Sequence, residues 1–120
     1  MSDVVVTVPK SMWLDWIEEG DLPGDEWTGM ASHFWIPRQG LPDIVRGERV
    51  YIVAHGKLRG WAPLNRIEAS CRIWQTRACL MRTTGAVALT IPEPIRGFQG
   101  WRRRWWDRSD EQPFPCWRAP

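Results

Sequence analysis

Two strand-forming runs around a glycine turn constrain the fold of this 120-residue chain more than any other feature. The runs are Arg49-Val50-Tyr51-Ile52-Val53-Ala54 and Lys57-Leu58-Arg59-Gly60-Trp61-Ala62, and His55-Gly56 separates them. Two residues ending in glycine between such runs are typical of a β-hairpin. Pro63 lacks a backbone N–H, so it predicts an edge or a bulge in the second strand. The sequence therefore predicts a sheet organised around a hairpin at 49–62.

Further short strands are predicted on both sides of the hairpin. Residues 4–8 are mostly valine and end at Pro9, which is typical of a buried strand. The other predicted strands cover residues 32–36, 72–82 and 86–91. Gly/Pro-rich segments separate them and indicate loops.

One helix is predicted near the start of the chain, where Ser11 can act as N-cap and Gly20 as terminator. Six or seven short strands and one helix can bury their apolar faces most simply by packing together in one domain. The predicted fold class is therefore α+β, a small mixed β-barrel with one or two flanking helices. We expect it to span residues 1–120, with 107–120 as an irregular tail that packs down through Phe114 and Trp117.

Charge is divided unevenly along the sequence. Residues 1–45 hold two cations and eight carboxylates, whereas residues 46–120 hold fourteen cations and six carboxylates. Only Lys10 and Lys57 among the sixteen cations are lysines. A basic, arginine-rich half is the pattern expected of a surface that contacts phosphates.

Several functional classes find no support in the sequence. The three cysteines form no CxxC pair, and His33 and His55 lack metal-binding spacing, so we predict no metal and no cofactor. No run approaches the roughly 18 apolar residues that span a bilayer. Met1-Ser2-Asp3 does not begin a secretory signal. We therefore expect a cytoplasmic protein without a membrane partner.

The segment from Gly97 to Trp106 concentrates three tryptophans and three arginines in ten residues. An indole can stack on a nucleobase, and a guanidinium can pair with a phosphate. If the segment is a strand, one face carries Trp101, Arg103 and Trp105, and the other carries Arg102, Arg104 and Trp106. If it is a helix, Trp101 and Trp105 lie side by side. Neither arrangement has an apolar face. An exposed stacking surface and a structural cation–π arrangement both remain open.

The hairpin carries a resemblance to a known superfamily. Its sequence from Gly47-Glu48 through His55-Gly56 to Gly60-Trp61-Ala62 is similar to the central hairpin of the PUA-like superfamily, particularly its EVE and ASCH branches. That resemblance implies a mixed barrel with a pocket for a base, modified or not, flipped out of its strand. It implies an aromatic cage of Trp27, Trp35 and Trp61, with Ser32 and His33 contacting the base edge. Phosphates would be held by Arg102, Arg103, Arg104 and Arg108.

The main prediction is thus a nucleic-acid-binding module, for RNA or DNA, that recognises a flipped base. Two alternatives stay open. Some ASCH relatives are hydrolases of modified nucleosides with a Lys–Thr–Glu set, for which this chain could supply Lys57, Thr28 and Glu68. Alternatively, the Trp/Arg surface could bind a protein partner, because both residue types are frequent interface hot spots.

Overall fold

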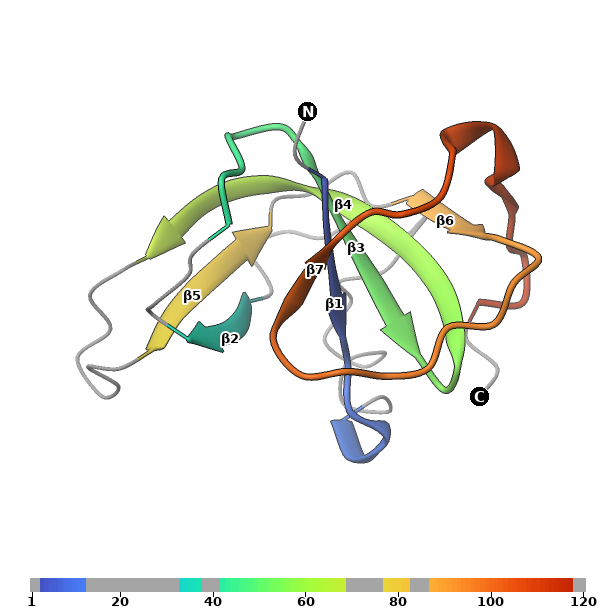
Figure 1. Ribbon diagram of the computed structural model, residues 1–120, viewed down its shortest axis with the longest axis horizontal. Helices are drawn as coiled ribbons and strands as arrows, with labels where there is room; N and C mark the ends of the chain where they lie inside the picture. Colours follow the sequence, from blue (N-terminus) through green and yellow to red (C-terminus); the bar gives the residue numbers. More distant parts are fainter. Residues whose placement is uncertain (1–2, 13–32, 38–41, 69–76, 83–86, 118–120) are drawn as a thin grey trace.

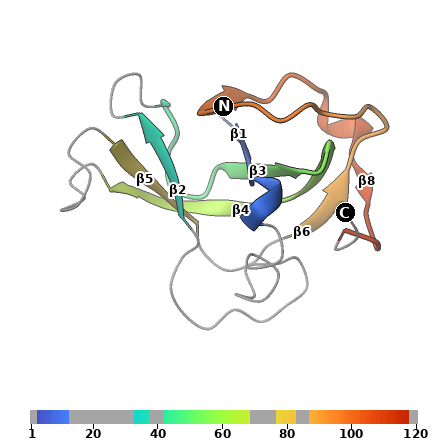
Figure 2. The same cartoon turned by 90° about the horizontal axis from the view of Figure 1, so that it is seen from below.

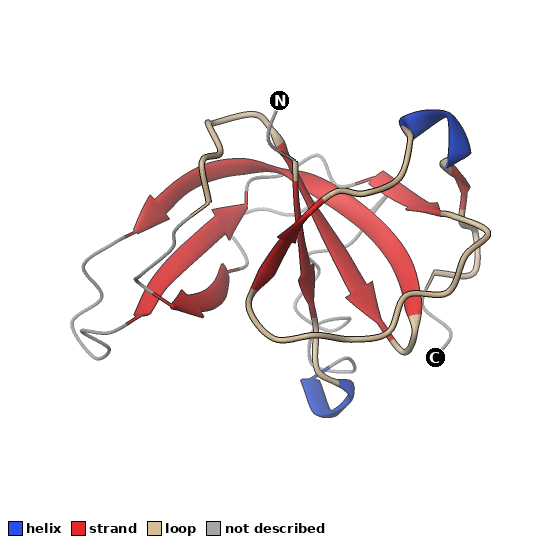
Figure 3. Cartoon of the chain, in the orientation of Figure 1, coloured by secondary structure: helices blue, strands red, loops and turns tan. Residues whose placement is uncertain are grey.

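The computed structural model describes residues 3–12, 33–37, 42–68, 77–82 and 87–117. Strands dominate these ranges (Figure 3), and their only helical elements are two single 3-10 turns, η1 (Lys10–Met12) and η2 (Arg108–Asp110). The helix predicted up to Gly20 lies mostly outside the described residues. The described part of the chain is therefore a mainly sheet domain.

The central hairpin is confirmed. Strands β3 (Arg49–Ala54) and β4 (Lys57–Glu68) pair antiparallel, with Ala54 opposite Lys57. His55 and Gly56 have φ of 49° and 73°, the two positive values that a two-residue type I′ turn requires. β4 extends beyond the predicted end at residue 62.

β4 is a long, curved strand (Figure 1) with two irregularities in its pairing. Opposite β3, Gly60 faces Ile52 while Leu58 faces Val53, so Arg59 is an extra residue that forms a bulge. Opposite β5, the register shifts between Leu64 and Arg66, directly after Pro63. The irregularity predicted near Pro63 is therefore confirmed, although β4 is an interior strand.

Eight strands form a mixed sheet. The main path runs β2-β5-β4-β3-β1-β7, and β6 joins β4 on one side and β8 on the other. β1 is parallel to β3, and all other pairs are antiparallel. The remaining bounds are Val4–Thr7 (β1), His33–Pro37 (β2), Arg77–Arg82 (β5), Val87–Thr90 (β6), Trp101–Arg103 (β7) and Gln112–Pro113 (β8). The mixed sheet was thus predicted correctly, and each predicted strand overlaps an observed one.

The sheet is open within the described residues. β2 and β7 are the two ends of the main path and do not pair with each other there. Figure 2 shows β2 and β5 at one end of the domain and β6 and β8 at the other. A closed barrel, as expected from the sequence, is not present in this part of the chain.

Hydrophobic cores lie on both faces of β1 and β3. Alternate residues of the two strands, such as Val6 and Ile52, enter the first core, and their neighbours Val5 and Tyr51 enter the second. Burial of both faces explains why these strands are mostly apolar rather than alternating. Late segments of the chain close both cores, because Trp117 packs into the first and Trp106 into the second.

Candidate functional site

The arginine–tryptophan segment begins as a strand, which resolves the choice between strand and helix. β7 pairs with β1, placing Trp101 opposite Val6 and Arg102 opposite Val5. Trp101 packs against the first core, and Arg102 therefore projects on the side of the second. β7 ends at Arg103, so the predicted alternation does not continue to Trp105 and Trp106.

Arg104 and Arg108, two of the four predicted phosphate contacts, bind the buried carboxylate of Asp3. Arg104 Nε and Arg108 Nη2 lie 3.1 Å and 2.7 Å from Asp3 Oδ2, and the backbone N–H of Arg49 donates to Oδ1 at 3.2 Å. Burial alone would raise the pKa of Asp3, but the hydrogen bonds from Arg108, Arg49 and Arg104 outweigh it and hold the pKa below 3.8. Asp3 is thus an internal anion that holds both guanidiniums against the domain.

A second buried carboxylate, Glu111, binds three side chains. It accepts hydrogen bonds from Tyr51 Oη at 2.5 Å, from Trp106 Nε1 at 2.9 Å and from Arg49 Nη1 at 3.0 Å. Burial, reinforced by Glu111, raises the pKa of Tyr51 to about 12.

Together these groups form the inner network, whose members are Asp3, Arg49, Tyr51, Arg104, Trp106, Arg108 and Glu111. Arg49 joins its two halves, because its backbone contacts Asp3 and its side chain contacts Glu111. The network fastens residues 104–111 to β1 and β3.

Other side chains of the same segment remain at the surface. The Arg102 guanidinium lies 4.4 Å from the ring centroid of Phe98, and Trp105 packs edge-on against Phe98 with centroids 6.4 Å apart. Trp105 is 45% exposed, and Arg102 is exposed as well. We call Phe98, Arg102 and Trp105 the outer cluster. It presents an exposed indole and a cation that rests on a partly buried phenyl ring, a combination that can take up a base and a phosphate.

Arg103 occupies a third environment. Its guanidinium lies 5.0 Å from the Trp101 ring centroid and donates to the carbonyl oxygen of Asp43 at 3.0 Å. The four predicted phosphate contacts are therefore divided between the inner network, the outer cluster and the opposite side of β7.

Trp61, the predicted cage residue with a described side chain, lies at the margin of the second core. The Arg49 guanidinium covers its ring at 4.2 Å from the centroid, in the place where a base would stack. Its Nε1 is buried and donates to none of the described residues. One face of this indole is therefore already occupied by a guanidinium.

The structure does not bring Trp35 close to Trp61. Trp35 and His33 belong to β2. Trp35 pairs with Cys79 of β5, and Cys79 pairs in turn with Glu68 of β4. Glu68 follows Trp61 by about 23 Å of extended strand. Trp27 and Ser32, the other predicted members of the base pocket, lie outside the described residues.

Two residues of the hydrolase alternative lie on the same strand. Lys57 begins β4 and Glu68 ends it, so up to about 36 Å of strand separates their backbones. Thr28 falls outside the described ranges.

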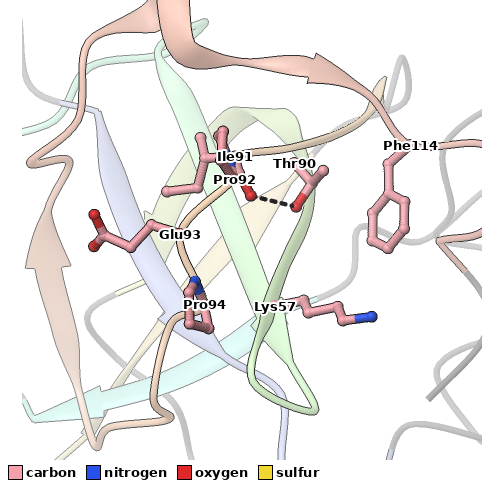
Figure 4. Close-up of a pocket in the computed structure, with 7 residues that line it drawn as sticks. All are labelled: Lys57, Thr90, Ile91, Pro92, Glu93, Pro94 and Phe114. Carbon is pink, nitrogen blue, oxygen red and sulfur yellow. Dashed lines mark hydrogen bonds between the residues drawn. The ribbon is translucent and has the colours of Figure 1, made fainter.

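Sequence reasoning missed a surface pocket of about 220 Å³ beside the tip of the β3–β4 hairpin. Figure 4 shows the residues that line it, which are Lys57, Thr90, Ile91, Pro92, Glu93, Pro94 and Phe114. The backbone N–H of Ile95 donates to the carbonyl of Gly56 at 2.9 Å and fixes the proline-containing loop to the hairpin turn. The pocket could not be predicted from the periodicity of apolar residues in the sequence, because residues from three separate segments line it.

Within the described ranges, no three His, Cys, Asp or Glu side chains are grouped so that they could hold a metal ion. Nor is any helix of those ranges long and apolar enough to cross a membrane.

Compared with known proteins, the chain matches no protein-family model, and no curated protein or solved structure shows significant similarity to it.

Proposed function

We propose that this protein binds single-stranded nucleic acid through the outer cluster of Phe98, Arg102 and Trp105. The observation that carries the proposal is an indole exposed by 45% next to a guanidinium that rests on a phenyl ring. A base can stack on the indole, while the guanidinium pairs with a neighbouring phosphate.

The local structure supports a preformed surface. Phe98 is anchored because its backbone N–H donates to Thr7 Oγ1 at 3.2 Å. Trp105 packs edge-on against the buried Trp106 with centroids 5.1 Å apart, and its Nε1 donates to Glu93 at 3.4 Å. Pre-ordered aromatic rings lose little conformational entropy on binding.

Finer proposals extend this one. We propose that the curved sheet belongs to a PUA-like fold, in a cytoplasmic protein. Recognition of a flipped base, modified or not, by Trp27, Trp35 and Trp61 remains part of the proposal. For the hydrolase alternative, Lys57 and Glu68 lie at opposite ends of β4.

Fluorescence anisotropy with labelled single-stranded RNA and DNA over a salt series tests the binding surface. We expect Trp105→Ala to weaken binding by about tenfold, since base–aromatic stacking contributes about 1–3 kcal/mol. Arg102→Ala should weaken it as well and make the salt dependence shallower by about one phosphate contact. Arg46→Ala, at an exposed turn before β3, serves as the matched control.

Absence of binding to any oligonucleotide, or equal binding by all these variants, would contradict the proposal. Retention of one protein partner after nuclease treatment, lost in Trp105→Ala, would instead support the protein-interaction alternative.

A further inference from the structure

We propose that the pocket beside the hairpin tip binds one nucleotide, with its base stacked on Phe114 and its phosphate paired with Lys57. The inference rests on the proposed nucleic-acid binding and adds a second contact to it. It concerns residues that lie outside both the outer cluster and the predicted tryptophan cage.

The size and shape of the pocket suit a single base. Its volume of about 220 Å³ is below the roughly 300–1,000 Å³ of sites that enclose a drug-sized ligand. Ile91 and two prolines give it apolar walls, and the half-buried Phe114 ring offers a stacking face. A flat base fits such a site while the sugar and phosphate stay at its rim.

The charges around the pocket favour an anionic ligand. Figure 4 shows the Lys57 ammonium and the Phe114 ring on the same side of the pocket, with the Glu93 carboxylate turned away from both. A second positive charge stands behind the ring, because the guanidinium of the fully buried Arg59 lies 5.5 Å from its centroid. A base stacked on Phe114 with its phosphate at Lys57 matches this arrangement, because Glu93 lies away from the phosphate.

One residue of the pocket lining also contacts the outer cluster. Glu93 lines the pocket and accepts the hydrogen bond from Trp105 Nε1 at 3.4 Å, so the exposed indole borders the same loop. A strand whose one base stacks on Trp105 could therefore place another base on Phe114. Two stacking positions joined by one loop would give the strand a defined path across the surface.

Titration of the full chain with adenosine monophosphate, adenosine and inorganic phosphate, followed by two-dimensional amide NMR, tests the site. We expect adenosine monophosphate to shift the amide signals of Lys57, Ile91 and Phe114, and to bind more tightly than adenosine or phosphate alone. Lys57→Ala should lower its affinity to that of adenosine. Phe114→Leu preserves an apolar side chain and should weaken binding by about tenfold through loss of stacking.

Lys10→Ala is the matched control, since Lys10 is the other lysine of the chain and is exposed in η1 away from the pocket lining. Thermal melting verifies that each variant folds, and Lys57→Ala tests the proposal even if Phe114→Leu is unstable. Unchanged pocket signals, or equal binding by wild type, Lys57→Ala and Phe114→Leu, would overturn the nucleotide site.

Oligonucleotide binding measured in parallel separates the two proposals. If oligonucleotides bind in a Trp105-dependent way but adenosine monophosphate does not bind in the pocket, the proposal of a nucleotide site is wrong and the proposed function stands. If adenosine monophosphate occupies the pocket but no oligonucleotide binds, the proposed function is wrong and the nucleotide site stands. If neither oligonucleotides nor adenosine monophosphate bind, both proposals are wrong.

Discussion

Arg102 and Arg104 are two residues apart, yet they belong to different parts of the molecule. Arg102 lies on Phe98 at the surface, whereas Arg104 binds Asp3, whose side chain is 3% exposed. Trp105 and Trp106 repeat the contrast, since the first is 45% and the second 8% exposed. The two buried carboxylates, Asp3 and Glu111, account for the difference: each recruits the cations and indole N–H groups that it can reach. Residue type alone therefore does not distinguish a binding surface from an internal support.

Truncation of the two neighbouring tryptophans should have very different effects on stability. Trp106→Ala should lower the free energy of unfolding by about 4 kcal/mol, because it empties part of the second core and leaves Glu111 with one donor fewer. Trp105→Ala should cost about 1 kcal/mol or less, since nearly half of that side chain is exposed. Urea unfolding of both variants measures the difference, and equal losses would show that the two indoles share one environment.

Asp3→Asn should destabilise the protein by about 3 kcal/mol at neutral pH, because it leaves two guanidiniums without their buried carboxylate. The loss should depend on pH. The pKa of Asp3 is depressed in the folded state, so its stabilisation is complete above the unfolded pKa near 3.8 and disappears as the pH falls through the folded value. Unfolding curves of wild type and variant should therefore converge in acid.

Asp43→Asn, at an exposed carboxylate, is the control for Asp3→Asn and should change stability by no more than about 0.5 kcal/mol. A constant difference between Asp3→Asn and wild type at every pH would mean that the carboxylate charge is not what holds Arg104 and Arg108.

The smallest expected effect concerns the only tyrosine of the chain, whose ionisation can be followed directly by ultraviolet absorbance. Tyr51 should titrate with a pKa of about 12, and Glu111→Gln should move that pKa toward 10 by removing the adjacent negative charge. Because the folded pKa is raised, the contribution of Tyr51 to stability is complete below pH 10 and is lost as the pH rises through about 12. A wild-type pKa near 10 would contradict the burial of this hydroxyl against Glu111.

Local signals in the sequence were sufficient for much of the sheet. The hairpin followed from His55-Gly56, because a two-residue turn with positive φ at both positions is specified by neighbouring residues alone. The valine-rich run at residues 4–8 likewise indicated a buried strand.

The site was harder to predict because its determinants are distant in sequence. Nothing near Arg104 or Arg108 shows that Asp3, more than a hundred positions earlier, neutralises them. The pocket beside Lys57 depends equally on a loop and on Phe114, which approach only in the folded chain. Periodicity also could not reveal that β7 stops at Arg103, which directs Trp105 and Trp106 into different surroundings.

The position of β1 has a consequence for the order in which this protein folds. β1 lies between β3 and β7, and Asp3 at its edge is bound by residues from a segment about a hundred positions later. A ribosome therefore releases the first strand long before the partner that encloses it has been synthesised. Contacts of such long sequence separation slow folding and leave apolar strands exposed in the meantime. The valines of β1, which are buried in the finished domain, are thus exposed until the residues that cover them have been synthesised.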